Sequence, residues 1–446
     1  MRKILLISVA ALILTGCIQQ PKAEKQLTPQ EQIIENIVRT SFPDKVWKVQ
    51  LDESANMQQA LQQAIDSCSY YGGGVVDVAP GMYALNGPLK LKSNVNLHLQ
   101  EGAYLQFSGR SKDFLPVVLT RWEGTELYGH SPMIYAYHAT NIAITGKGTI
   151  DAQAGLEFAT WGPKEANDRD RLREMGDKLT PVQERIFGEG TILRPSFVQF
   201  YGCSRILVED VTFKDSPFWT IHPVFCDNVI VRGVTIDSHF PNNDGCDPES
   251  CENVLIEDCV FNTGDDCIAI KSGRNNDGRA WSLPSRNIIV RNCQMKDGHA
   301  GVAIGSEISG SCYNVWMEDC QIGSPEMDRP FRIKSNAIRG GVVSGFYIRN
   351  IDISECKQAV LKLELKYEKV TTGLYYPLFE NILLENITCQ KSRYGIWIDG
   401  LEDHICVKNV TLNNCHFNGI TDEKVNSIVG AEGVTFTNST FNGQTL

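Results

Sequence analysis

Three short segments in the middle of the chain combine carboxylate or imidazole groups with glycine. They are 242–247 (NNDGCD), 264–267 (GDDC) and 298–301 (GHAG). Asp265 and His299 each follow, by twelve residues, the Asn that opens a short apolar segment. This common spacing predicts that Asp265 and His299 occupy the same level in neighbouring repeats of one stacked structure.

Asp244 follows the Asn of its own repeat by sixteen residues, within a turn that we expect to be four residues longer. That allowance puts Asp244 at the level of Asp265 and aligns Cys246 with Cys267. Stacked strands lie about 4.8 Å apart. The sequence therefore predicts that Asp244, Asp265 and His299 form a column, with Asp266 beside Asp265.

Two cations belong to the next repeat. In the segment 331–335 (FRIKS), Arg332 and Lys334 alternate with apolar residues, so both point to the same face of a strand. Clustered carboxyl groups are suited to glycoside hydrolysis, in which one acid protonates the leaving oxygen and a carboxylate activates water. Crowding keeps one of them protonated, and the cations could bind the carboxylate of an acidic sugar.

The elements that would position these residues are short strands in a repeated pattern. A polar residue, often Asn, precedes two to four apolar or β-branched residues at spacings of 23, 25, 34 and 27 residues between positions 205 and 314. Such periods without intervening helices predict an all-β, single-stranded, right-handed parallel β-helix of about ten coils. A helix with spacing typical of an amphipathic segment, 56–68, is expected to cap its N-terminal end.

The chain has 15 cysteines, and seven of them recur at two positions of the repeat: Cys203, Cys226, Cys251 and Cys312 at one, and Cys259, Cys293 and Cys320 at the other. No CxxC pair or Cys/His cluster is present, so we expect neither a metal site nor a cofactor. Most of the cysteines are predicted to be stacked inside the coils as small apolar residues. One or two disulfides remain an alternative.

The first residues predict export. Two basic residues precede an apolar run and the segment 14–17 (LTGC), which resembles a bacterial lipobox. We expect a lipoprotein signal over 1–16, a lipidated Cys17 with a tether over 17–27, and one β-helix domain over 28–446. An uncleaved anchor or an ordinary secretory signal are the alternatives. The predicted location is the outer membrane, on either side, with the lipid as the only membrane contact.

The 446 residues carry a formal net charge of −11. This charge argues against a nucleic-acid partner, which needs a basic surface. A polyanion could bind only through a local basic patch.

At this point the sequence resembles glycoside hydrolase family 28, the polygalacturonase family. The family's four ordered motifs read here as 242–244 (NND), 264–266 (GDD), 298–300 (GHA) and 332–334 (RIK). The resemblance implies inverting hydrolysis of galacturonosyl bonds in pectic oligo- or polysaccharides. Asn243 departs from the family's Thr, and Ala300 departs from its second Gly.

The resemblance also implies a role for each matched residue. Asp265 would be the general acid, Asp244 and Asp266 would activate water, and His299 would tune the acid. The residues expected to bind substrate are Arg332, Lys334, Asn242, Tyr367 and Arg274.

The segment 152–192 departs from the repeat, is highly charged and is partly helical in pattern. An insertion of this size could close one end of a groove, which favours exo action over endo cleavage. A rhamnogalacturonan or rhamnose-linked galacturonide hydrolase is the nearest alternative, because fold analogy cannot separate the two. A pectate lyase and a non-catalytic glycan-binding lipoprotein are the others.

Overall fold

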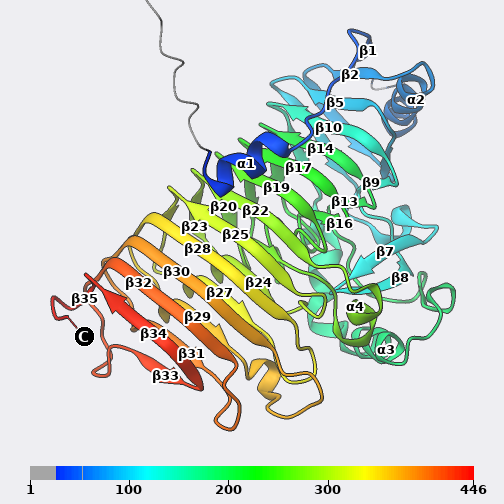
Figure 1. Cartoon of the computed structure of the whole chain (residues 1–446). Coiled ribbons are helices and arrows are strands. Elements are labelled where there is room, and N and C mark those ends of the chain that lie inside the picture. The colour runs from blue at the N-terminus through cyan, green and yellow to red at the C-terminus, as the bar shows by residue number, and fades with distance from the viewer. Residues whose placement is uncertain (1–26, 53, 446) are drawn as a thin grey trace, which may run out of the picture.

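The computed structural model describes residues 27–445 except residue 53, and shows a stack of short parallel strands wound into coils (Figure 1). The predicted right-handed parallel β-helix is confirmed, with one 22-stranded sheet and smaller sheets of six, four and three strands. The predicted signal sequence, Cys17 and, apart from Leu27, the tether lie outside the described residues. In the described part of the chain, no helix is both long and apolar enough to span a membrane.

One face of the coils is a column of parallel strands. From the N-terminal end, its members are β1 (Val46–Val49), β2 (Gly74–Val78), β5 (Val95–Leu99), β10 (Thr140–Gly146), β14 (Ser204–Glu209), β17 (Asp227–Arg232), β19 (Glu252–Glu257), β22 (Ser285–Arg291), β25 (Cys312–Glu318), β28 (Val342–Ile353), β30 (Leu378–Cys389), β32 (Val407–Phe417) and β34 (Ala431–Thr437). A second column follows it around the coil and is continuous with the first in β28, β30 and β32. Its separate strands are β3 (Gly81–Leu85), β6 (Ala103–Phe107), β11 (Thr149–Asp151), β15 (Thr212–Lys214), β18 (Thr235–Ser238), β20 (Val260–Thr263), β23 (Gln294–Asp297), β26 (Gln321–Ile322) and β35 (Thr440–Phe441).

The third column carries the candidate site. Its first part is β4 (Leu89–Leu91), β9 (Ile134–Tyr137), β13 (Val198–Tyr201) and β16 (Ile221–Val224), and its second part is β21 (Ile268–Ile270), β24 (Ala300–Gly305), β27 (Arg329–Lys334), β29 (Ala359–Glu364), β31 (Tyr394–Asp399) and β33 (Ser427–Val429). Bridges through Cys246 and Glu249 join β16 to β21. The two parts therefore form one continuous face.

The interior of the coils is apolar because the strands alternate. In β5, for example, Val95, Leu97 and Leu99 are fully buried while the residues between them are half-buried. Every cysteine in the described part of the chain is buried and free, which confirms the interior assignment. No disulfide forms among them. The register places Cys203, Cys226 and Cys251 at one level of successive coils.

The recurrent Asn residues serve the bends between columns. Asn253, Asn287 and Asn314 all have φ of 57°, a left-handed conformation that Asn adopts more readily than most residues. Their side chains also bond along the stack. The amide of Asn287 donates to Asn253 at 3.1 Å, and that of Asn314 donates to Asn287 at 3.3 Å. The Asn repeats thus have a structural role.

Two helices close surfaces of the β-helix. The predicted cap is α2 (Met57–Tyr70), which Asn56 caps through its side chain and which buries Leu61 and Ile65 against the first coils (Figure 1). The sequence interpretation missed α1 (Pro29–Asn36). This helix lies across the outside of the first column, where Ile33, Ile34 and Ile37 pack on neighbouring strands.

The departures from the repeat form a layer beside the third column. The hairpin β7 (Val118–Trp122) and β8 (Thr125–Gly129) extends through β12 (Ile186–Phe187), next to α3 (Ala166–Asp177) and α4 (Asn275–Trp281). Short 3₁₀ turns complete the chain: η1 (Ser111–Phe114), η2 (Ala154–Leu156), η3 (Phe158–Thr160), η4 (Gly162–Lys164), η5 (Val182–Glu184) and η6 (Tyr367–Lys369). The expected insertion at 152–192 is therefore partly helical, and its location brings it to the candidate site.

Candidate active site

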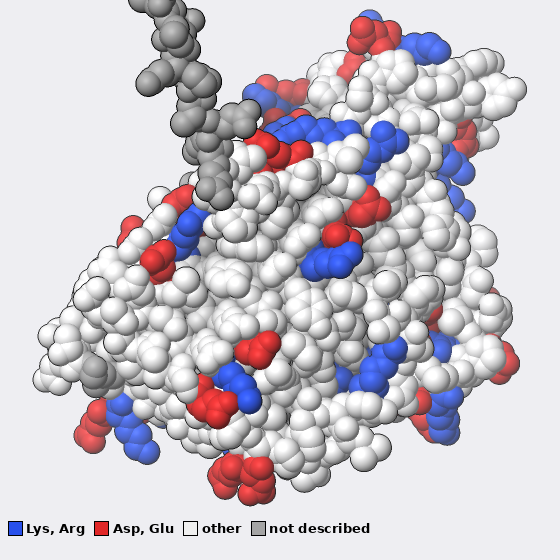
Figure 2. Space-filling model, in the orientation of Figure 1, with Lys and Arg blue, Asp and Glu red and all other residues white. Residues whose placement is uncertain are grey.

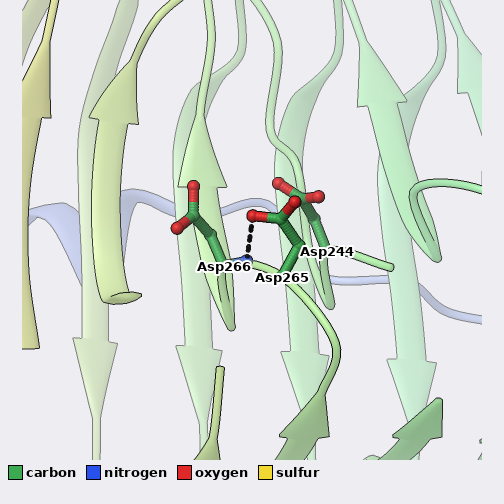
Figure 3. A group of neighbouring side chains, drawn as sticks. All are labelled: Asp244, Asp265 and Asp266. Carbon is green, nitrogen blue, oxygen red and sulfur yellow. Dashed lines mark hydrogen bonds between the residues drawn. The ribbon is translucent and has the colours of Figure 1, made fainter. Parts of the chain in front are cut away.

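Three aspartates from two neighbouring coils converge at the N-terminal ends of third-column strands. One carboxylate oxygen each of Asp244, Asp265 and Asp266 lies within 4.8 Å of the others. Figure 3 shows the side chains grouped on one side, and the backbone amide of Asp266 donates to Asp265 Oδ1 at 2.9 Å. Asp265 is the most accessible of the three, with 17% of its side chain exposed, whereas Asp244 and Asp266 are buried.

His299 is where its spacing predicted. Strand β21 pairs with β24 at a constant offset, Ile268 with Val302, which puts Asp265 and His299 at the same level. The His299 amide donates to the Asp265 carbonyl at 3.0 Å, and its ring Nδ1 lies 2.9 Å from Asp265 Oδ1. This hydrogen bond to the carboxylate raises the pKa of His299, because it stabilises the protonated ring.

The level expected for Asp244 was wrong by one residue. Ser238 pairs with Thr263, and Cys246 bridges to Ile268, so the turn 239–245 has seven residues against four in 264–267. The extra length is three residues, not four. Cys246 is therefore level with Ile268 and not with Cys267, and Asp244 is level with Asp266.

The long turn is shaped by a residue that replaces the family's Thr. Asn243 is fully buried, and its carbonyl oxygen accepts from the Phe240 amide at 2.9 Å and from the Ser238 hydroxyl. The side-chain amide of Asn243 donates to the Ser216 carbonyl at 2.9 Å. Asn243 thus holds the turn in place and points away from the carboxylates.

Three cations hold Asp266 ionised. Lys334 Nζ donates to Asp266 Oδ2 at 2.8 Å in a buried pair. Burial by itself raises the pKa of Asp266, but Lys334, Arg332 and Lys271 outweigh burial and bring that pKa below its usual value. Asp266 is therefore a carboxylate near neutral pH.

Asp244 has the opposite electrostatic character. Burial, followed by the nearby charge of Asp265, raises the pKa of Asp244 well above its usual value. The site thus holds an ionised carboxylate next to a carboxyl group that retains its proton, which is the combination that acid–base catalysis requires.

The cations predicted to bind substrate lie one coil further. Strand β27 pairs with β24 so that Arg332 is level with Ala303 and Lys334 with Gly305. The ring of Tyr367 lies 5.5 Å from the Arg332 guanidinium carbon and 5.7 Å from Lys334 Nζ. The structure therefore brings Arg332, Lys334 and Tyr367 together beside the aspartates. Arg332 also donates to Glu364 at 2.6 Å.

Asn242 and Arg274 are placed differently. Asn242 accepts a hydrogen bond at 2.7 Å from Arg194, whose guanidinium also pairs with Glu165 of the insertion. Arg274 is buried in ion pairs with Glu307 and Glu368, each at 3.4 Å. Burial and the neighbouring arginines 173 and 339 lower the pKa of Arg274 to about 10. Both residues thus have protein partners next to the site.

The sequence interpretation missed two groups at the site. Asp247 is fully buried, neither of its carboxyl oxygens has a hydrogen-bond partner among the described residues, and burial followed by Asp244 raises its pKa well above normal. Lys271 donates to Glu307 at 3.1 Å and lies over the Trp219 ring. Asp247 ends the same acidic segment as Asp244, and Lys271 ends the strand after Asp265, so position alone could have indicated both.

A parallel β-helix with a mixed acid and carboxylate cluster and adjacent cations has the arrangement of a polysaccharide-cleaving glycoside hydrolase. The comparisons with known proteins agree. The family model of Glycosyl hydrolases family 28 matches residues 81–426, and the chain belongs to this family of O-glycosyl hydrolases.

Individual relatives extend the likeness. A probable polygalacturonase of Vitis vinifera is 29% identical over 374 residues, covering 80% of this chain and 70% of its own. An endo-polygalacturonase of Pectobacterium carotovorum is 28% identical, covering 76% and 79%. The solved structure of a hyperthermoactive exopolygalacturonase from Thermotoga maritima superposes with a TM-score of 0.85 at 36% identity, covering 93% of this chain and 96% of that one.

Proposed function

We propose that this protein is an exo-acting polygalacturonase that hydrolyses galacturonosyl bonds at the ends of pectic chains. The observation that carries the proposal is the cluster of Asp244, Asp265 and Asp266 within 4.8 Å, with Lys334 bound to one of them. The cations supply a place for a sugar carboxylate in an otherwise acidic chain. The name of the Thermotoga relative supports both the substrate and the exo mode.

In the proposed mechanism Asp265 is the proton donor. It is the carboxyl group of the three that a substrate can reach, because 17% of its side chain is exposed and the other two are buried. Asp266, kept ionised by Lys334, draws the proton from the attacking water, with Asp244 orienting that water. His299 fixes the direction of the Asp265 carboxyl group through its ring nitrogen.

We propose inversion of the anomeric configuration on the family resemblance alone. The spacing of the carboxylates does not favour it, because oxygens within 4.8 Å are closer than the usual separation of about 6.5–9.5 Å in inverting enzymes. Following the anomer of the first product by proton NMR tests it. An α-linked galacturonide should release the β-anomer first, and first release of the α-anomer would exclude inversion.

The exo mode is supported by contacts that the insertion makes on both sides of the site. On one side, Glu165 holds Arg194, which bonds to Asn242 in the acidic turn. On the other side, Arg173 of α3 lies 3.6 Å from Glu368, next to Tyr367. A segment bonded to both sides closes one end of a groove and leaves room for a chain terminus.

The test follows polygalacturonate digestion by viscosity and by product chromatography. We expect small products from the start and a slow fall in viscosity. A rapid fall in viscosity with few new reducing ends would contradict exo action. Rhamnogalacturonan oligosaccharides in a parallel digestion would instead be the preferred substrate if the nearest alternative holds. Products that absorb in the ultraviolet would indicate a lyase.

Replacing Asp265 by Asn tests the assignment of the acid. We expect the turnover rate to fall by about 10²–10⁴-fold, because the amide cannot donate an acidic proton. The matched control is Asp258→Asn, at an exposed left-handed turn where the neighbouring coil already has Asn292. Equal activity of the two variants, or loss of both, would contradict the assignment.

Localisation is a separate part of the proposal. We propose that the protein is an outer-membrane lipoprotein anchored through Cys17, on the basis of the segment 14–17 (LTGC).

A further inference from the structure

A second pocket lies on the far side of the β7–β8 hairpin from the aspartates. It has a volume of about 470 Å³ and is bounded by the hairpin, by α4 and by the C-terminal ends of β9, β13 and β16. This volume is within the range of small-ligand sites, about 300–1,000 Å³. The carboxylate cluster lies at the opposite ends of the strands. Asp244 and Glu249 are five residues apart, which at about 3.3 Å per residue is roughly 16 Å.

The pocket is lined by aromatic rings. Tyr137 and Trp281 are 48% and 44% exposed, which leaves large ring faces open to solvent. Tyr137 stacks on Tyr201 with ring centroids 5.7 Å apart, and Phe225 lies against Trp281 at 4.7 Å. Exposed aromatic faces arranged in this way are suited to stack against the apolar faces of sugar rings.

Buried hydrogen bonds hold the rings in place. The Trp281 indole donates to Glu126 Oε2 at 2.8 Å, and the Tyr201 hydroxyl donates to Glu126 Oε1. The Arg121 guanidinium lies beneath the Phe225 ring, 4.7 Å from its centroid. A surface that is rigid before binding loses little conformational entropy when a ligand stacks on it.

Phe225 stands where a bulky residue is unfavourable. It continues a column of left-handed residues at the strand ends, with φ of 47° at His138, 62° at Gly202, 54° at Phe225 and 52° at Ser250. A Phe is strained in this conformation, which Gly and Asn adopt easily. This unfavourable conformation places the Phe225 ring in the pocket.

The charge of the pocket favours neutral ligands over acidic ones. Among the described residues that line it, Glu126 is the charged one, and none is Lys or Arg. The arginines beneath are already paired. Arg121 bonds to Glu249 at 2.9 Å, and Arg185 bonds to Asp277. A uronate would therefore meet a carboxylate and no free cation, whereas His138 and Gln183 can hydrogen-bond to sugar hydroxyl groups.

We propose that this pocket binds a neutral pyranose residue of a glycan, separately from the acidic substrate in the catalytic groove. The aromatic rings supply stacking, and His138 and Gln183 supply hydrogen bonds. The β7–β8 hairpin lies between the two sites. Its turn packs on Arg274 and Glu307, and its strands line the pocket.

The test uses the full chain and two neutral probes, β-1,4-galactotetraose and xylotetraose, with trigalacturonate as the charged counterpart. Trp281→Ala and Tyr137→Ala each remove one ring, and Tyr70→Ala is the control because Tyr70 is 84% exposed on α2, far from the pocket. Binding is measured by isothermal titration calorimetry, folding by near-ultraviolet circular dichroism, and hydrolysis on oligogalacturonides.

We expect the wild type and Tyr70→Ala to bind at least one neutral probe equally, and both pocket variants to bind it about tenfold or more weakly. Hydrolysis of oligogalacturonides should be unchanged within about twofold in all three variants. The proposal is overturned if neither neutral probe binds the wild type at roughly 10 mM. It is also overturned if folded pocket variants bind like the control, or if trigalacturonate is the ligand whose binding they lose.

Discussion

Two of the three aspartates of the site, Asp244 and Asp266, differ in how tightly each binds its proton. Asp266 is bonded to Lys334 and has a lowered pKa, while burial raises the pKa of Asp244. A single column of carboxyl groups can therefore supply an acid and a base at one pH. The difference arises from nearby cations, and Lys334 reaches Asp266 from two coils further along the stack, so the base is defined as much by Lys334 as by its own carboxylate.

Replacing Lys334 by Met should shift the pH profile of hydrolysis. Removing the cation raises the pKa of Asp266, so this carboxylate becomes protonated at a higher pH as the solution is acidified. We expect the acidic limb of the kcat/KM profile to move to higher pH, with a higher KM as a sugar-binding cation is lost. The profile from about pH 3 to pH 8 measures this shift.

Lys357→Met is the control for this variant. Lys357 forms an exposed ion pair with Glu326 at 2.7 Å, away from the aspartates. Its removal should leave the profile unchanged. An acidic limb that stays in place in Lys334→Met would show that Asp266 is not the group whose ionisation is required.

At the scale of the elements, the bends determine which residues meet. The left-handed Asn residues let each coil turn, and their side chains bond from coil to coil. The same kind of bend allowed Asp265 and His299 to be placed from sequence, because both follow their Asn by the same number of residues. It failed for Asp244, because turn 239–245 gains three residues and the sequence does not show where they go.

Replacing Asn287 by Ala tests the energy stored in one bend. The variant loses two ladder hydrogen bonds and puts Ala in a left-handed conformation that Asn adopts more readily. We expect the free energy of unfolding to fall by about 2–3 kcal/mol. Asn287→Gly avoids the backbone strain and should lose only about 1 kcal/mol, through the hydrogen bonds. Guanidinium unfolding measures both, and equal losses would contradict the assigned role of the left-handed bend.

Two features missed from the sequence differ in how predictable they were. The helix α1 could have been predicted, since Thr28 and Glu31 form a capping box and Pro29 occupies the first turn of the helix. The pairing of Arg274 had no such signal, because Glu307 and Glu368 lie 33 and 94 residues away in sequence. Cations could be predicted near the site from the sequence, whereas which of them are neutralised depends on how distant loops pack.

At the scale of the whole molecule, the net charge does not determine where an acidic polymer can bind. The formal net charge of −11 is spread over a long stack, and Figure 2 shows acidic and basic side chains intermixed on the face it presents. Ion pairs along the first column, such as Arg291 with Glu257 at 2.6 Å, account for part of this mixing. Attraction for an acidic polymer therefore depends on the site around Arg332 and Lys334.

The proposed lipid anchor leads to a prediction at this scale. Cys17→Ser removes the thiol that would carry the lipid, so the variant should leave the membrane fraction while hydrolysing oligogalacturonides at the wild-type rate. Fractionation of cells and mass spectrometry of the mature N-terminus measure this. A wild type that is already found without lipid in the soluble fraction would refute the anchor.

The constant spacing between coils has a consequence for how such an enzyme can diversify. Backbone hydrogen bonds set the rise from one coil to the next at about 4.8 Å, whatever side chains the loops carry. A lineage could thus acquire, trim or exchange a segment such as 152–192 while the distances among Asp244, Asp265 and Asp266 are preserved. Grafting loops between relatives should therefore change which polymer is bound while the catalytic residues keep their positions. The constant spacing of the coils makes that exchange possible.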